Sequence, residues 1–254
     1  EKIPSLKRVK LQGMGEPFLN PNLKEILEFG KKKKISFETI SNGSVLKTNT
    51  YLLPYFDYVF VSFDSSTKSN FERIRRGSNF DLIIENLQII SNFKYKNKLN
   101  TKIGLNTVIT HLNYQEIPKI IEISRSLMLD SVLFVEVENW LTPSEKEFLK
   151  QREFIKQARK YSLEIKEMIE KEKTKHSLLR IGLKTGKQRK LVCGWPFYKI
   201  FITVDGFITP CEIRMNPETF NFGNIYQEDF KKIWGGEKYQ KFKELNKEYS
   251  KSDL

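Results

Sequence analysis

Short apolar runs alternate along the first half of the chain with segments in which apolar residues recur every three or four positions. Runs rich in valine, isoleucine, leucine and phenylalanine predict strands that are buried on both faces. These runs are residues 8–12, 36–40, 58–63, 102–109 and 131–137. The segments with helical spacing are residues 22–29, 80–93 and 114–127. Such alternation is typical of βα units around a parallel sheet.

The second half of the chain has a different pattern. Residues 144–172 keep one apolar stripe on an otherwise charged segment, which predicts a long helix. A short strand is expected at 178–183. Residues 192–213 predict a strand, a turn and a second strand around Asp205-Gly206, a pair of the kind that favours hairpins. A final helix is predicted over residues 230–245.

These elements predict an α/β protein in three segments. A complete (β/α)8 barrel takes about 250 residues, and residues 1–143 are too few for one, so a partial or open barrel is expected there. Residues 144–190 would form a long helix, a strand and a basic linker. Residues 191–254 would form a small module with a β-hairpin and a helix.

The positive net charge of the chain suggests nucleic-acid binding, but it is weak evidence for that function. The formal net charge is +13, from 44 basic and 31 acidic residues. Lysine greatly exceeds arginine, and the run Lys31–Lys34 follows a predicted helix, whose carbonyl end favours cations. Most of the lysines are therefore assigned to a solvated surface. The sequence has neither an apolar secretion segment nor a membrane-length apolar stretch, so a cytoplasmic protein without a membrane partner is expected.

Polar residues follow the predicted strands at their carboxyl ends. The segment Gly13–Pro17 reads GMGEP, residues 41–43 read SNG, and residues 62–64 read SFD. Asn106 lies inside the fourth predicted strand. Because barrel enzymes place their sites at the carboxyl ends of strands, these groups are expected to converge on one ligand. Each turn taken singly could instead be only a turn former or a helix cap.

Cys193 and Cys211 are the two cysteines of the sequence. They could form a disulfide, remain as buried thiols, or supply half of a metal site. A cytoplasmic setting disfavours the disulfide. Motifs for other chemistries, such as HExxH, GxSxG and GxxxxGK, do not occur.

The ordered series GMGEP, SNG, VSFDS, RRG and LNTVIT resembles the motifs of radical S-adenosylmethionine (SAM) enzymes. The resemblance covers nearly the whole chain, and it implies a partial barrel of the (β/α)6 type over residues 1–143. It implies that the GMGEP segment, through Gly13, Met14, Gly15, Glu16 and Pro17, holds the amino group of SAM. It also implies that Ser62, Asp64 and Arg76 lie near the ribose and carboxylate of SAM, and that Ser41, Asn42 and Asn106 line the pocket.

The C-terminal module resembles a SPASM domain. Cys193, Gly206 and Cys211 match the opening pattern of that domain, and the segments FGNI and KKIWGGEKYQKF are similar to those that follow it. The resemblance implies that Cys193 and Cys211 are ligands of an auxiliary iron-sulfur cluster. A cluster usually takes four thiolates, so these two would be half of a site.

The resemblance implies reductive cleavage of SAM to a 5'-deoxyadenosyl radical, which abstracts hydrogen from a peptide, protein or small-molecule substrate. Flavodoxin or ferredoxin would supply the electron. The CxxxCxxC motif that holds the family's [4Fe-4S] cluster does not occur in these 254 residues. We therefore expect truncation at both ends, and an inactive chain as it stands.

Two other classes of function stay open from the sequence. One is a noncatalytic binding protein on a barrel scaffold, basic enough to hold RNA or an acidic partner. The other is a barrel enzyme of different chemistry, because a fold does not settle a function.

Overall fold

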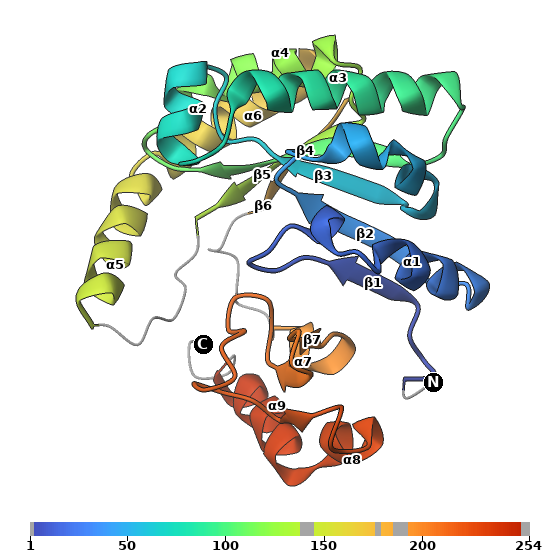
Figure 1. The fold of residues 1–254 in the computed structure, drawn as a ribbon. Coiled ribbons are helices and arrows are strands. Elements are labelled where there is room, and N and C mark those ends of the chain that lie inside the picture. The colour runs from blue at the N-terminus through green and yellow to red at the C-terminus, as the bar shows by residue number, and fades with distance from the viewer. Residues whose placement is uncertain (1–2, 138–144, 176–178, 185–192, 250–254) are drawn as a thin grey trace. The chain divides into compact units, whose positions relative to one another are not determined.

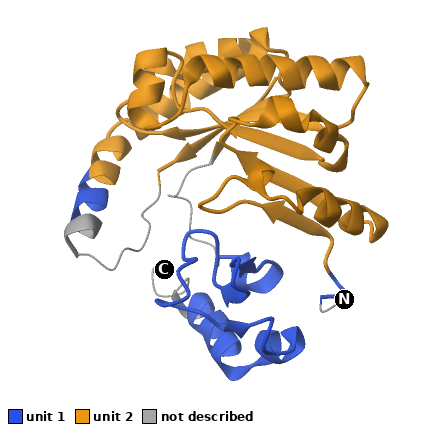
Figure 2. Cartoon of the chain, in the orientation of Figure 1, with its two compact units in different colours: residues 1–5, 138–153, 185–254 blue, residues 6–137, 154–184 orange. Residues whose placement is uncertain are grey.

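The computed structural model describes residues 3–137, 145–175, 179–184 and 193–249 (Figure 1). The chain divides into two compact units (Figure 2). The sheet unit comprises residues 6–137 and 154–184, and the hairpin unit comprises residues 1–5, 138–153 and 185–254. In the part of the chain that the structure describes, no helix has the length and apolar character needed to cross a membrane. The predicted division into three segments remains a prediction.

The sheet unit is built on six parallel strands in consecutive order. They are β1 (Arg8–Leu11), β2 (Ser36–Ser41), β3 (Tyr58–Ser62), β4 (Lys102–Ile109), β5 (Ser131–Glu136) and β6 (Arg180–Lys184). Because every strand runs in the same direction, their carboxyl ends share one edge of the sheet. The strands predicted from the apolar runs are confirmed, and so is the partial-barrel fold class.

Helices connect the strands and pack on one face of the sheet. The α-helices are α1 (Leu23–Lys32), α2 (Lys68–Ile74), α3 (Phe80–Lys96), α4 (Ile117–Ser126) and α6 (Ser162–Lys175), and the 3-10 helices are η1 (Pro17–Leu19), η2 (Leu46–Tyr55) and η3 (Tyr114–Glu116). Figure 1 shows α3, α4 and α6 together on one side of the sheet. Alternate strand residues such as Val59, Val61 and Leu105 are fully buried toward this side. On the other face, Phe60 and Ser62 of β3 and Asn106 and Val108 of β4 are only half-buried.

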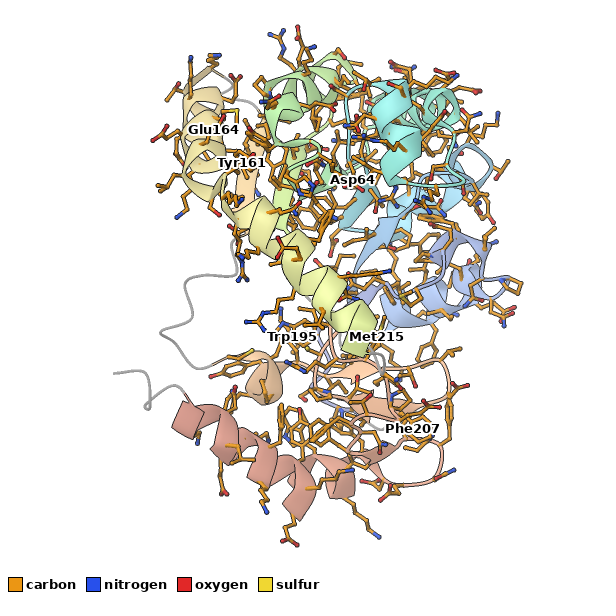
Figure 3. All side chains as sticks on the ribbon, turned by 90° about the vertical axis from the view of Figure 1, so that its left-hand side faces the viewer. Asp64, Tyr161, Glu164, Trp195, Phe207 and Met215 are labelled. Carbon is orange, nitrogen blue, oxygen red and sulfur yellow. The ribbon has the colours of Figure 1, made fainter. Side chains whose placement is uncertain are left out.

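The predicted long helix over residues 144–172 is wrong in one respect, because it is two helices. Helix α5 (Glu145–Arg159) ends before Lys160, and α6 begins at Ser162. The Ser162 hydroxyl donates to the carbonyl of Arg159 at 2.9 Å and so satisfies the end of α5. Between the helices, the Tyr161 ring stacks on Tyr114, with centroids 4.3 Å apart (Figure 3). That ring contact fixes the break.

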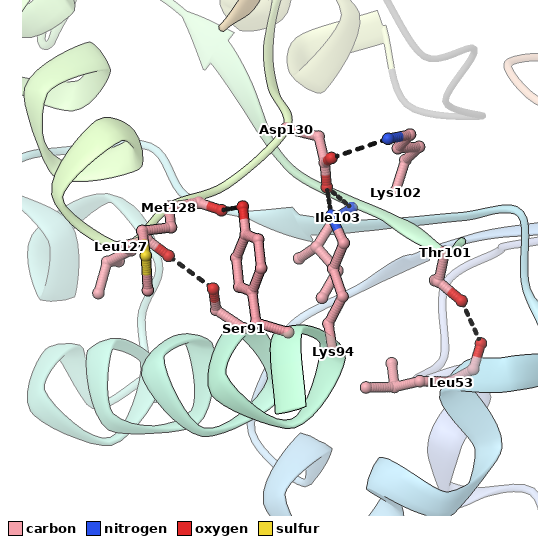
Figure 4. Close-up of polar contacts among 10 residues, drawn as sticks. Leu53, Ser91, Lys94, Thr101, Lys102, Ile103, Leu127, Met128 and Asp130 are labelled. Carbon is pink, nitrogen blue, oxygen red and sulfur yellow. Dashed lines mark hydrogen bonds and ion pairs between the residues drawn. The ribbon is translucent and has the colours of Figure 1, made fainter. Parts of the chain in front are cut away.

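A charged network closes the edge of the sheet opposite the carboxyl ends (Figure 4). Asp130 accepts hydrogen bonds from the buried Lys94 ammonium, from the Ile103 N–H at 2.8 Å and from Lys102 at 3.2 Å. Burial raises the pKa of Asp130, but the bonds from Lys94 and Ile103 outweigh it, and the pKa lies below its usual value. The network joins α3 to β4 and β5.

The hairpin unit holds a small antiparallel sheet of β7 (Phe201–Ile202), β8 (Phe207–Thr209) and β9 (Gly223–Asn224). Its helices are α7 (Trp195–Tyr198), α8 (Phe230–Gly235) and α9 (Glu237–Tyr249). The predicted turn at Asp205-Gly206 is confirmed, with Gly206 at φ +84°. The core is aromatic and centres on Phe222, which contacts Phe220, Tyr239 and Phe242 at centroid distances of 5.0, 4.2 and 5.2 Å.

Two predictions in this unit need correction. The strand expected before the turn is only Phe201–Ile202, because Trp195–Tyr198 forms a helical turn, with Pro196 in the first-turn region where proline is tolerated. The helix predicted at 230–245 is two helices, since Gly236 has extended backbone at φ −67° and ψ 153° and ends α8. Val192 lies outside the described residues.

Candidate functional site

In the turn after β1, residues 13–15 are exposed, whereas the Glu16 side chain is half-buried and hydrogen-bonded. Met14 is 84% exposed, and a Cβ placed at Gly13 or Gly15 would meet no atom within 4 Å. The Glu16 carboxylate, in contrast, accepts from the Asn42 N–H at 2.6 Å, the Ser41 hydroxyl at 2.9 Å and the Phe18 N–H at 3.2 Å. Glu16 therefore ties the turn after β1 to the turn after β2, and the glycine backbone beside it remains accessible.

Ser41 and Asn42 are used inside the protein as well. Ser41 is 1% exposed, on the helix-covered face of the sheet, and its hydroxyl accepts from the Gly43 N–H at 2.9 Å. The Asn42 side-chain oxygen accepts from the Ser44 N–H at 2.8 Å. The structure thus places both residues at the expected edge, but the Ser41 side chain does not lie on the more open face.

Asp64 lies at the end of β3 and is 4% exposed (Figure 3). Its carboxylate accepts from the Val108 N–H at 2.7 Å and from the Arg75 guanidinium at 2.6 Å. Its carbonyl accepts from the Asn113 amide at 2.7 Å. Asp64 therefore joins the loop after β3 to the end of β4. Arg75 is the arginine that pairs with it, whereas Arg76 is exposed.

Ser62 and Asn106 behave differently from these residues. They are register partners on β3 and β4 and lie on the half-buried face of the sheet. Neither side chain makes a hydrogen bond with any other residue that the structure describes. Of the residues predicted from the sequence, these two bring unengaged polar groups together beside the carboxyl edge.

Glu116 was not predicted from the sequence. It begins α4, and its carboxylate accepts from the Ser65 and Ser66 hydroxyls, each at 2.7 Å, from the Ser66 N–H at 2.6 Å and from the Asn70 amide. Burial raises the pKa of Glu116, and the bonds from Ser66, Ser65 and Asn70 outweigh it, so the pKa lies below the usual range. These bonds hold the loop that follows Asp64. No local pattern joins residues so far apart in the sequence.

Cys193 and Cys211 are half-buried free thiols, so the structure forms no disulfide between them. Cys193 lies two residues before α7, a single turn of about 6 Å. Continuing the register of Phe201 with Thr209 places Cys211 opposite Lys199, directly after that turn. Cys211 therefore lies at the open end of the hairpin, and Cys193 lies on the other side of α7 in the sequence.

The two thiols have the chemistry of soft-metal ligands, and they are half-buried and free of a disulfide. Groups of three or more His, Cys, Asp or Glu side chains suited to a metal do not occur in the part of the chain that is described. Two thiolates are half of the usual ligand set of an iron-sulfur cluster. Thr209, two residues before Cys211, is fully buried, and its hydroxyl has no partner among the described residues.

Comparison with known proteins gives a family for one part of the chain. Residues 193–253 match SPASM, an iron-sulfur cluster-binding domain. The tungsten-containing aldehyde ferredoxin oxidoreductase cofactor-modifying protein of Pyrococcus furiosus is 24% identical over 273 residues, which are 98% of this chain and 73% of that protein.

Solved structures give the fold of the whole chain. Streptococcus suis SuiB bound to S-adenosylmethionine superposes with a TM-score of 0.70 at 16% identity, over 93% of this chain and 56% of SuiB. The structure of anSMEcpe with bound AdoMet gives a TM-score of 0.63 at 15% identity, over 94% of this chain and 69% of that chain. The chain thus spans little more than half the length of SuiB.

The fold is that of radical SAM enzymes, with a partial barrel of parallel strands. Residues 193–253 match the SPASM domain model. The resemblance to a radical SAM protein with a SPASM-type domain, predicted from the motifs, is confirmed.

Proposed function

We propose that the protein binds SAM at the carboxyl edge of its six-stranded sheet and acts as a radical SAM enzyme. One observation carries the proposal: Ser62 and Asn106 present unengaged polar groups side by side on the more open face of the sheet. The exposed Gly13–Gly15 backbone follows a strand of the same edge. Half-buried polar groups that make no hydrogen bond within the described residues are available to a polar ligand at such an edge.

Some residues at the carboxyl edge of the sheet would contact SAM, and others would hold the turns in place. The Gly13–Gly15 backbone would contact the amino group of SAM, and Ser62 and Asn106 would donate to its ribose or carboxylate oxygens. Arg76 is exposed and could reach an anionic group. Glu16 and Asp64 are engaged by protein donors and would hold the turns in place.

When bound, a [4Fe-4S] cluster would supply the electron that splits SAM into methionine and the 5'-deoxyadenosyl radical that abstracts hydrogen from the substrate. Its three ligands would have to come from outside these 254 residues, which contain two cysteines. Cys193 and Cys211 would hold an auxiliary iron-sulfur cluster in the SPASM domain.

The substrate class is drawn from the relatives. SuiB has a structure bound to the precursor peptide SuiA, and the Pyrococcus furiosus relative is named as a cofactor-modifying protein. A peptide, a protein or a protein-associated cofactor is therefore the proposed substrate. A flavodoxin or ferredoxin as the electron donor stays a prediction.

Isothermal calorimetry tests SAM binding without turnover. The chain should bind SAM with a Kd in the micromolar range, about −8 kcal/mol. Each of Ser62→Ala and Asn106→Ala should weaken binding by about fivefold, since a hydrogen bond contributes about 1 kcal/mol. Ser126→Ala and Asn97→Ala are matched controls, because each side chain makes an exposed hydrogen bond to the backbone of its own helix.

Two results would contradict the proposal. If SAM does not bind the unaltered chain while RNA binds with a steep salt dependence, the noncatalytic binding protein is favoured instead. If SAM binds but both site variants match their controls, the ligand lies elsewhere, and a barrel enzyme of other chemistry becomes the better account.

A further inference from the structure

Helix α9 reaches back to the first cysteine of the SPASM domain. The side-chain amide of Asn246 donates to the carbonyl oxygen of Cys193 at 2.8 Å, across 53 residues of sequence. The contact is half-buried. The bond holds the backbone of Cys193, a residue that belongs to none of the three strands of the small sheet.

Asn246 lies on the face of α9 that packs into the hairpin unit. Tyr239, Phe242, Lys243 and Asn246 follow helical spacing. Tyr239 is 1% exposed, and Phe242 packs on Phe222 at 5.2 Å. The Lys243 ammonium lies 4.1 Å from the centre of the Trp234 ring. Because these contacts fix the rotation of α9, the Asn246 amide is held at one place on the surface of the core.

The two cysteines are therefore anchored in different ways. Cys211 lies two residues after β8, and its carbonyl accepts from the Arg214 N–H at 3.2 Å. Cys193 precedes a helix of a single turn. The bond from Asn246 ties the Cys193 backbone itself to α9, whereas the Lys247 ammonium, 5.5 Å from the centre of the Phe197 ring, ties α7 to the same helix.

We propose that Asn246 is a positioning residue of the iron-sulfur site, which sets the Cys193 thiol at the distance from Cys211 that allows one metal to bind both. This inference rests on the proposed role of Cys193 and Cys211 as cluster ligands. An amide suits the task because its N–H donates to the carbonyl, whereas a carboxylate would face that oxygen with a second acceptor.

Cadmium binding to the whole chain under reducing conditions tests the inference without requiring a complete cluster. Thiolates bind soft metal ions and give an ultraviolet charge-transfer band whose intensity counts the bound sulfurs. We expect one Cd²⁺ per chain with a two-thiolate band. Cys193→Ser and Cys211→Ser should each halve the intensity at saturation.

Asn246→Asp should bind Cd²⁺ at least tenfold more weakly, with the intensity of one thiolate at saturation. Asn246→Ser removes the bond without adding a charge and should do the same, which covers the case that the aspartate variant does not fold. The matched control is Asn221→Asp, since the Asn221 amide makes the same kind of bond, to the Pro217 carbonyl at 2.7 Å, away from the cysteines. It should match the unaltered chain.

The possible failures are distinguishable. If the unaltered chain shows no two-thiolate band, the cluster-ligand role of the cysteines fails, and the positioning role fails with it. If that band is present and folded Asn246 variants keep its full intensity and affinity, only the positioning role is overturned. An equal loss in Asn221→Asp would also overturn it, because the effect would then be one of general stability.

Discussion

Replacing Glu116 with glutamine tests how the loop after β3 is held. The Glu116 carboxylate accepts four hydrogen bonds from three residues of that loop and of α2. A glutamine keeps the shape and one acceptor oxygen, but it turns an N–H₂ group toward donors. We expect the loop that contains Asp64 to loosen, and SAM affinity to fall with it.

The magnitude follows from the contacts. Hydrogen bonds to a charged group contribute about 1.5–3 kcal/mol each, but Glu116 is only half-buried, so water replaces part of what is lost. A loss of about 2 kcal/mol in the free energy of unfolding is therefore expected. In a unit of this size, 1 kcal/mol corresponds to about 2–4 °C, and Tm should fall by about 4–8 °C.

The pH dependence of this stabilisation has a definite sign. The pKa of Glu116 is lowered in the folded protein, so its contribution is fully present above the unfolded pKa of about 4.3. It is lost as the pH falls through the unfolded and then the folded pKa. The stability gap between the unaltered chain and Glu116→Gln should thus be constant near neutrality and shrink below about pH 4.

Urea unfolding followed by circular dichroism at pH 7 and pH 3.5 measures this gap. Glu122→Gln is the control, since Glu122 lies on the same helix, is 71% exposed and makes only a 4.0 Å contact with Arg125. Its effect should be within about 0.5 kcal/mol. A Glu116→Gln gap that is no larger than that of the control, or that widens on acidification, would refute the reasoning.

Three further substitutions test other contacts. Glu16→Ala unties the first two turns, so SAM affinity measured by calorimetry should fall by about tenfold or more; an unchanged affinity would contradict the supporting role. Asp130→Asn leaves the buried Lys94 ammonium without its carboxylate and should cost about 3 kcal/mol in urea unfolding; a loss under 1 kcal/mol would argue against it. Gly206→Ala places a Cβ 2.5 Å from the Tyr226 ring at φ +84°, so near-ultraviolet dichroism should show the hairpin unit melting earlier.

The sheet could be predicted from the sequence because doubly buried strands leave continuous apolar runs. The small elements were missed for equally physical reasons. Helix α2 has seven residues, of which only Phe71 is buried, so it has no periodic stripe to detect. The break before Ser162 depends on the Tyr161 ring meeting Tyr114, a tertiary contact that the helical pattern of 144–172 does not contain. The stop at Gly236 was visible in the sequence, because the pair Gly235-Gly236 is a turn signal, and the predicted helix over 230–245 ran through it.

The position of the candidate site could be predicted from the sequence, but not which of its side chains bond within the protein and which are available to a ligand. Strand ends predict the edge at which Ser41, Ser62 and Asp64 lie. Which side chain faces the helices and which faces the open side depends on register, and a shift of one residue exchanges the two. Ser41 and Ser62 are each the last residue of a strand. The Ser41 side chain is buried and bonded within the protein, whereas the Ser62 hydroxyl is half-buried and available to a ligand.

The double engagement of the Glu16 carboxylate has a consequence for how such motifs are used to infer activity. A side chain that clamps two loops is retained by selection for a foldable protein, whether or not the molecule still turns over a substrate. Relatives that have drifted into noncatalytic roles would keep this acid and still carry the signature. The side chains of Ser62 and Asn106 make no hydrogen bond with the other described residues, so substitutions there would cost the fold little. The residues found at these two positions are therefore a better indicator of retained catalysis.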